Sequence, residues 1–120
     1  MAFPRKGGRH TPAFILLLLA ENPSHGAGLL KKMESTLPFC LSDSAGLYRA
    51  LQNLEKDGAV SSAWETPDSG GPKKIYRITR AGEALLAELA SDIERRQENF
   101  RVFLEQWNKI SKKDPRQESL

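Results

Sequence analysis

The first half of the chain carries apolar residues at helical spacing. A helix is predicted from Pro12 to about Glu21, around an apolar run at 14–20, with Thr11 as its capping residue. A second helix is predicted from His25 to Ser35 after an Asn-Pro turn, with Ser24 as its cap. Its apolar stripe consists of Leu29, Leu30 and Met33. The first helix is apolar enough to be buried in a core.

The third predicted helix has two distinct faces. Capping residues stand at 42–44, and Gly58 is expected to end the helix in a left-handed conformation. Leu47, Leu51 and Leu54 lie within about 60° of one another at 100° per residue. These leucines should face the core, and the opposite face should therefore be exposed.

The pattern changes to extended spacing after this helix. Val60 to Glu65 and Lys74 to Ile78 are predicted to be strands, joined by the Gly- and Pro-rich segment 66–72 as a hairpin tip. Thr79 is expected to cap a last helix of about 30 residues, which nothing but Gly82 interrupts. Three short helices followed by a hairpin predict a winged helix-turn-helix, mainly α with a small β-hairpin (α+β).

This organisation predicts one domain with appendages. The expected parts are a flexible basic arm at 1–10, a winged-helix DNA-binding domain at 11–80, a C-terminal dimerisation helix at 81–111 and a disordered tail at 112–120. In a winged helix the third helix can enter a major groove and the hairpin can reach an adjacent groove or phosphate.

The exposed face of the third helix carries side chains that can contact bases and phosphates. The hairpin adds two lysines, and Arg77 follows nearby. A solvated helix face is the alternative interpretation, and the basic hairpin next to it favours DNA. The residues expected to contact DNA are Ser44, Ala45, Tyr48, Arg49, Gln52, Asn53, Lys56, Lys73 and Lys74.

A heptad pattern in the last helix predicts a homodimer. Its members alternate spacings of three and four, and Arg96 is the one polar residue among them. A helix of roughly 45 Å cannot bury this stripe on a domain with a radius of gyration near 12 Å. A two-fold dimer would also place two reading helices about 34 Å apart on DNA. The predicted dimerisation residues are Leu86, Leu89, Ile93, Phe100, Phe103, Trp107 and Ile110.

Charge and composition narrow the possibilities further. The formal charge is +3, and residues 1–80 hold 11 Lys/Arg against 7 Asp/Glu, which suits a polyanion without requiring one. The run at 14–20 is too short to span a bilayer, so a cytoplasmic protein without a membrane partner is expected. Cys40, His10 and His25 cannot form a structural zinc site. No metal, cofactor or catalytic set is expected, which argues against an enzyme.

The chain resembles the PadR family of bacterial transcription regulators. The resemblance rests on Gly46-Leu47-Tyr48 at the start of the third helix, on Leu51, Leu54, Glu55 and Gly58 after it, and on the junction from Tyr76 to Gly82. The resemblance covers about two thirds of the chain. The single C-terminal helix is similar to that of the shorter branch of the family.

The resemblance implies a winged-helix homodimer that represses neighbouring genes and releases DNA when a small molecule binds. Phe100, Phe103 and Trp107 could then line an effector cavity between subunits, although seam packing is the alternative. Two departures from the family pattern are Arg49 and Ala27, which stand where proline and an aromatic residue are frequent. Outside this interpretation, the main alternative is a winged-helix adaptor that binds protein and has no operator.

Overall fold

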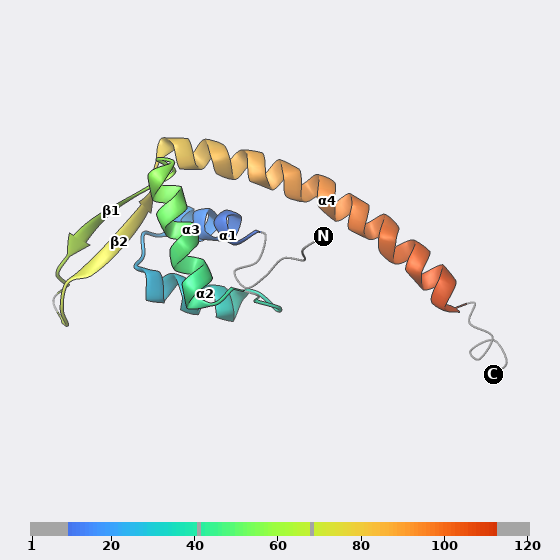
Figure 1. Cartoon of the computed structure of the whole chain (residues 1–120), viewed down its shortest axis with the longest axis horizontal. Helices are drawn as coiled ribbons and strands as arrows, with labels where there is room; N and C mark the ends of the chain where they lie inside the picture. Colours follow the sequence, from blue (N-terminus) through green and yellow to red (C-terminus); the bar gives the residue numbers. More distant parts are fainter. Residues whose placement is uncertain (1–9, 41, 68, 113–120) are drawn as a thin grey trace. The chain divides into compact units, whose positions relative to one another are not determined.

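The computed structural model describes residues 10–40, 42–67 and 69–112 and confirms the predicted fold class. The elements, shown in Figure 1, are α1 Thr11–Glu21, α2 Gly26–Thr36, α3 Ser44–Lys56, β1 Val60–Glu65, β2 Lys73–Ile78 and α4 Arg80–Lys112. The chain divides into two compact units, residues 1–87 and 88–120, and α4 contributes to both.

The predicted arm and tail lie outside the described residues, apart from His10, which precedes α1, and Lys112, which ends α4. Among the described residues, no helix is long and apolar enough to cross a membrane.

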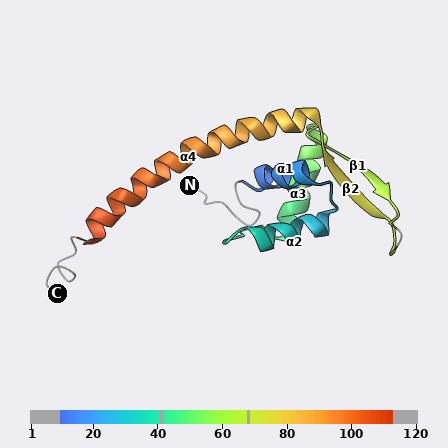
Figure 2. The ribbon, with the colours of Figure 1, turned by 180° about the vertical axis from the view of Figure 1, so that it is seen from behind.

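The core of the first unit forms where α1, α2 and α3 meet (Figure 2). Leu47, Leu51 and Leu54 of α3 are buried, as predicted, and so are Leu29 and Met33 of α2. Helical spacing of three and four places each set on one face, so the two faces pack together. The large side chains that are fully buried are Ile15, Leu16, Leu29, Met33, Leu47 and Leu51.

Three of the predicted helix boundaries are confirmed by their hydrogen bonds or backbone angles. The Asp43 carboxylate accepts from the Gly46 N–H at 2.8 Å and caps α3. Gly58 follows α3 with φ of 80°, a conformation that favours glycine. The Thr79 hydroxyl accepts from the Gly82 N–H at 3.1 Å and begins α4.

Two predicted caps are wrong. Thr11 is the first residue of α1, and its hydroxyl is hydrogen-bonded to the hydroxyl of Ser42. Ser24 does not cap α2, whose N-cap residue is His25; the Ser24 hydroxyl donates to the His25 carbonyl, and its backbone forms an isolated bridge with Tyr76 of β2 through hydrogen bonds of 2.8 and 3.2 Å. Both side chains suit a cap chemically, but tertiary contacts between distant segments decide their roles.

The hairpin is antiparallel, and β2 begins one residue earlier than predicted, at Lys73. Its Cα pairs run from Val60 opposite Ile78 at the base to Glu65 opposite Lys73 near the tip. Alternate residues face alternate sides of a strand. Buried Val60 and Tyr76 therefore define an inner face that packs on the helices of the first unit.

The last helix begins in close contact with the end of α3. Gly82 is buried, and a Cβ at this position would lie 2.0 Å from the Ala59 carbonyl oxygen. The missing side chain therefore allows the backbone of α4 to approach the segment that follows α3. With 33 residues, α4 is about 50 Å long at 1.5 Å per residue.

Candidate nucleic-acid interface

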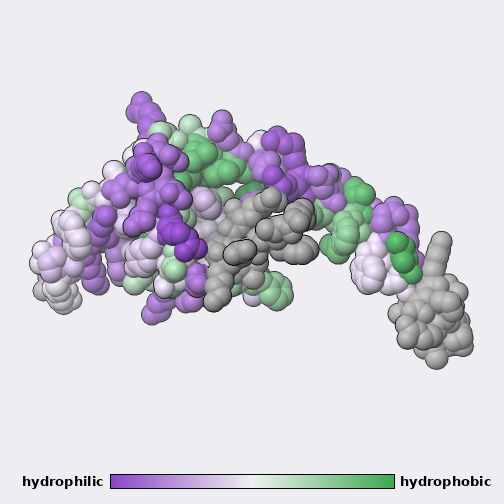
Figure 3. Space-filling model, in the orientation of Figure 1, coloured by the Kyte–Doolittle hydropathy of each residue, from purple (hydrophilic) through white to green (hydrophobic). Residues whose placement is uncertain are grey.

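The outward face of α3 is polar and accessible. The three leucines of α3, Leu47, Leu51 and Leu54, are buried. The space-filling view in Figure 3 shows mainly hydrophilic residues over this part of the molecule. The structure thus brings the predicted reading residues together on one solvent-facing surface, hereafter the reading face. All seven predicted α3 residues are exposed, namely Ser44, Ala45, Tyr48, Arg49, Gln52, Asn53 and Lys56.

Tyr48 is positioned by the first turn of α2. A Cβ on the buried Gly26 would lie 2.4 Å from the Tyr48 ring, so the ring occupies the space that a side chain would fill. Tyr48 still exposes 43% of its surface. Its ring is therefore held against the domain while part of the residue faces solvent, a geometry suited to donating a hydrogen bond to a phosphate. Sequence reasoning did not identify Gly26, whose partner is 22 residues away.

The three basic residues of the wing differ in their surroundings. Lys74 lies 3.7 Å from a Glu55 carboxylate oxygen and 5.5 Å from the centre of the Tyr76 ring. Arg77 pairs with Glu65 at 2.7 Å. Lys73 is exposed and forms no ion pair with any part of the chain that the structure describes. Lys73 is therefore the wing cation most available to a phosphate.

Glu55 links α3 to the hairpin, a role that sequence reasoning missed. One carboxylate oxygen accepts a hydrogen bond from the Ser62 hydroxyl of β1, and the other faces Lys74 of β2. An ion pair as accessible as this one is worth about 0–1 kcal/mol, so its main effect is positional. It fixes the orientation of the inner face of the hairpin relative to the end of the reading helix.

The predicted dimerisation residues differ in exposure along α4. Leu86, Leu89 and Ile93 are half-buried. The distal aromatic segment, defined here as residues 100–110, exposes its predicted members, with Phe103 66% and Trp107 54% accessible. Figure 3 shows hydrophobic residues among hydrophilic ones along this helix. Two exposed apolar residues there lie outside the heptad pattern, Val102 and Leu104.

Charged residues of α4 pair along the helix. Arg96, the polar member of the heptad, donates to Asp92 at 2.6 Å. Arg101 lies between Glu98 and Glu105. Its hydrogen bond and positive charge hold the pKa of Glu98 below the ordinary value, and Glu98 and Glu105 raise the pKa of Arg101. These pairs one turn apart support the helix in water.

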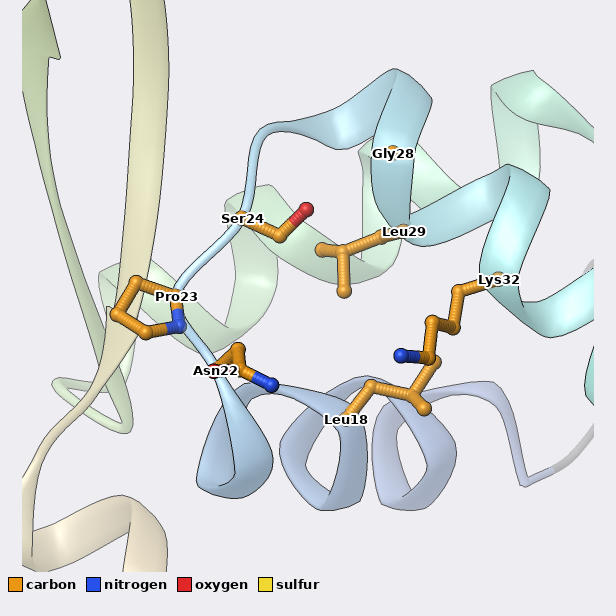
Figure 4. Close-up of a pocket in the computed structure, with 7 residues that line it drawn as sticks. All are labelled: Leu18, Asn22, Pro23, Ser24, Gly28, Leu29 and Lys32. Carbon is orange, nitrogen blue, oxygen red and sulfur yellow. The ribbon is translucent and has the colours of Figure 1, made fainter.

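A small pocket lies between α1 and α2 (Figure 4). It has a volume of about 90 Å³, and its polar groups are contributed by Asn22 and Ser24 from the connection between α1 and α2 and by Lys32 from α2. Leu18 and Leu29 supply its apolar lining. In the described ranges, no group of three or more His, Cys, Asp or Glu side chains is placed to hold a metal ion.

Comparison with known proteins identifies the family. Residues 15–88, more than half of the chain, match the model of the transcriptional regulator PadR-like family. The chain belongs to this family. The resemblance found in the sequence is therefore confirmed, and this PadR-like chain is a transcriptional regulator.

Individual proteins are similar to this chain over most of its length. An uncharacterised protein of Lysinibacillus sphaericus is 30% identical over 98 residues, which are 80% of this chain and 89% of that protein. The transcriptional regulator Rv3488 of Mycobacterium tuberculosis is 38% identical over 74 residues, 62% of this chain and 66% of that protein. The solved structure of TM0937, described as a potential transcriptional factor, has a TM-score of 0.74 and 30% identity, covering 94% of this chain and 100% of that one. The family and the two relatives that are described as regulators or potential transcription factors point to regulation rather than to an enzyme.

Proposed function

We propose that this PadR-like regulator binds a palindromic DNA operator as a homodimer and represses transcription from it. The observation that carries the proposal is the reading face of α3, where Arg49, Gln52 and Asn53 are exposed above a leucine face that is buried. Arginine pairs with guanine, and amide side chains pair with adenine, in the major groove. Lys73 of the wing, which forms no ion pair among the described residues, supplies a phosphate contact.

The homodimer is supported by the distal aromatic segment. Phe100, Phe103 and Trp107 are exposed in the single chain, and contiguous apolar surface of this kind is typical of a protein contact. A second copy offers the same segment, and two-fold pairing produces a symmetric interface. Such a dimer requires two half-sites in inverted orientation, which is why we propose a palindrome.

The test is binding of the purified chain to duplex DNA from its own promoter region over a range of salt concentrations. We expect Arg49→Ala to weaken binding by about 5- to 150-fold, because a bidentate base contact is worth about 1–3 kcal/mol. The matched control is Arg95→Ala on α4, which removes the same charge from a side chain that is 72% exposed. Its affinity should stay within about twofold of the parent. Absence of duplex binding at low salt would contradict the proposal.

Two further outcomes concern the finer parts of the proposal. An effector that binds between the two copies stays a prediction, supported by the aromatic character of Phe100, Phe103 and Trp107. A ligand that releases the duplex and changes Trp107 fluorescence would support it. The adaptor alternative predicts that a double Lys73→Ala and Lys74→Ala variant loses a protein partner in a pull-down and keeps its DNA retention.

A further inference from the structure

Trp64 is an exposed aromatic residue in the wing that the reading face does not explain. It lies in β1, one residue before the strand ends, and exposes 70% of its surface. Tryptophan is highly buried on average in folded domains, and tryptophan residues are enriched at binding interfaces, so exposed Trp64 is a candidate for a binding contact. Neither the predicted DNA contacts nor the predicted dimer seam includes Trp64.

The position of Trp64 in the strand places it on the inner face of the hairpin. Val60, Ser62 and Trp64 alternate along β1 and therefore point to the same side. Val60 is buried, and Ser62 reaches Glu55 of α3. Trp64 thus continues, beyond the helices, the same hairpin face that adjoins the end of α3. In Figures 1 and 2 the two strands run from their junction with α3 and α4 toward a tip that lies apart from the helices.

The surroundings of Trp64 are basic and polar. Its Cα partner across the hairpin is Lys74, which shares its face, and Lys73, the next residue toward the tip, alternates to the opposite face. On the inner face its neighbours along the strands are Ser62 and Lys74, so it is not part of a contiguous apolar patch. The core of a protein-protein interface is apolar and depleted in charge. An exposed aromatic side chain beside a cation is instead typical of nucleic-acid binding, in which rings pack on sugars or bases and cations hold phosphates.

We propose that Trp64 contacts DNA beside the segment that α3 reads, with its indole packed on deoxyribose. The inference rests on the proposed function and adds a wing contact to it. Glu55 links the inner face of the hairpin to the end of α3. The indole and the reading helix would therefore contact neighbouring parts of one duplex. The contact lies on the backbone, and it should therefore act on every sequence alike.

The mutational test distinguishes loss of the Trp64 indole from loss of the positive charge of Lys73. Trp64→Ala should weaken duplex binding by about tenfold on operator and non-operator DNA, as expected for loss of one aromatic contact, and should leave the salt dependence unchanged. Lys73→Ala should instead lower the slope of log affinity against log salt by about 0.9. Trp64→Tyr should retain most of the affinity. Ser61→Ala, on the opposite face of β1, is the control for general effects on the hairpin.

A fluorescence test uses the two tryptophans of the full chain. The conservative variant Trp107→Phe leaves Trp64 as the single reporter. Adding duplex should change its emission and reduce its quenching by acrylamide. If a labelled duplex binds while the emission and quenching of Trp64 stay constant, the wing contact is refuted and the proposed function stands. If no duplex binds, both proposals fail. Unchanged affinity in Trp64→Ala would also overturn the contact.

Discussion

The inward face of α3 and the distal aromatic segment of α4 carry similar apolar patterns with opposite outcomes. Leu47 and Leu51 are fully buried, whereas Phe103 and Trp107 expose 66% and 54% of their surfaces. Both stripes repeat at spacings of three and four. The difference shows that such a pattern indicates a face that needs cover and does not tell which chain provides it.

Burial of the apolar side chains in the two regions stabilises different things, the fold of one chain in α3 and the association of two chains in the distal aromatic segment. Burial of the α3 leucines contributes to folding within one chain. Covering one large apolar side chain is worth about 1.5–3 kcal/mol, and in the distal segment this free energy is still available for association. Substitutions in the two regions should therefore change different measurements.

The largest effect is expected for a double substitution in the distal segment, Phe100→Glu with Phe103→Glu. Loss of two aromatic contacts and addition of charge should weaken the proposed homodimer by about 10²- to 10⁴-fold, measured by sedimentation equilibrium. The first unit should keep its cooperative unfolding. A control with Ser91→Glu and Asn108→Glu adds the same charge on the outer face of the heptad. If the control dimer dissociated as much as the Phe100 and Phe103 double variant, the predicted dimer interface along the heptad would be contradicted.

In the α3 region, Leu51→Ala should lower the free energy of unfolding by about 2–5 kcal/mol, because it leaves a cavity in the core. Urea denaturation at one fixed protein concentration measures this change. The control is Leu17→Ala in α1, whose side chain is 47% exposed and should cost less than about 1 kcal/mol. Similar losses in the free energy of unfolding at the two positions would contradict the assignment of Leu51 to the core.

The smallest effect is expected at Arg96, the polar member of the heptad. Arg96→Leu extends the apolar stripe and should tighten the homodimer by roughly fivefold, or about 1 kcal/mol. Arg95→Leu removes the same charge one residue away, outside the heptad, and should leave the dimer unchanged. Sedimentation of the three proteins checks both expectations, and a weaker Arg96→Leu dimer would place position 96 outside the seam.

Local signals allowed most of the fold to be predicted. Asp43, Gly58 and Thr79 act through neighbours within a few residues, and these boundaries are visible in the sequence. Thr11 and Ser24 were assigned wrongly, because their partners are 31 and 52 residues away. A capping side chain has the same chemistry wherever its partner lies, so the sequence does not separate these cases.

The exposed face of α3 could be predicted from the sequence, whereas the contacts between different elements of the candidate interface could not. Leucine spacing alone places Arg49 and Gln52 outward. The sequence ranks Lys73 and Lys74 equally, whereas Glu55 neutralises only Lys74. The contact between Gly26 and Tyr48 also depends on how two helices cross. Such pairs arise only once the elements are packed.

The base of the hairpin is closed by hydrogen bonds at Thr79. Its hydroxyl donates to the Gly58 carbonyl at 2.6 Å, and its N–H donates to the Ala59 carbonyl at 3.0 Å. Both ends of the hairpin are thus anchored independently of its tip. Doubling the loop between Glu65 and Lys73 would cost only about 0.6 kcal/mol in closure entropy. Insertions there can lengthen the wing while α3 stays in place, so the span of DNA that the wing reaches can diverge among related regulators without loss of the fold.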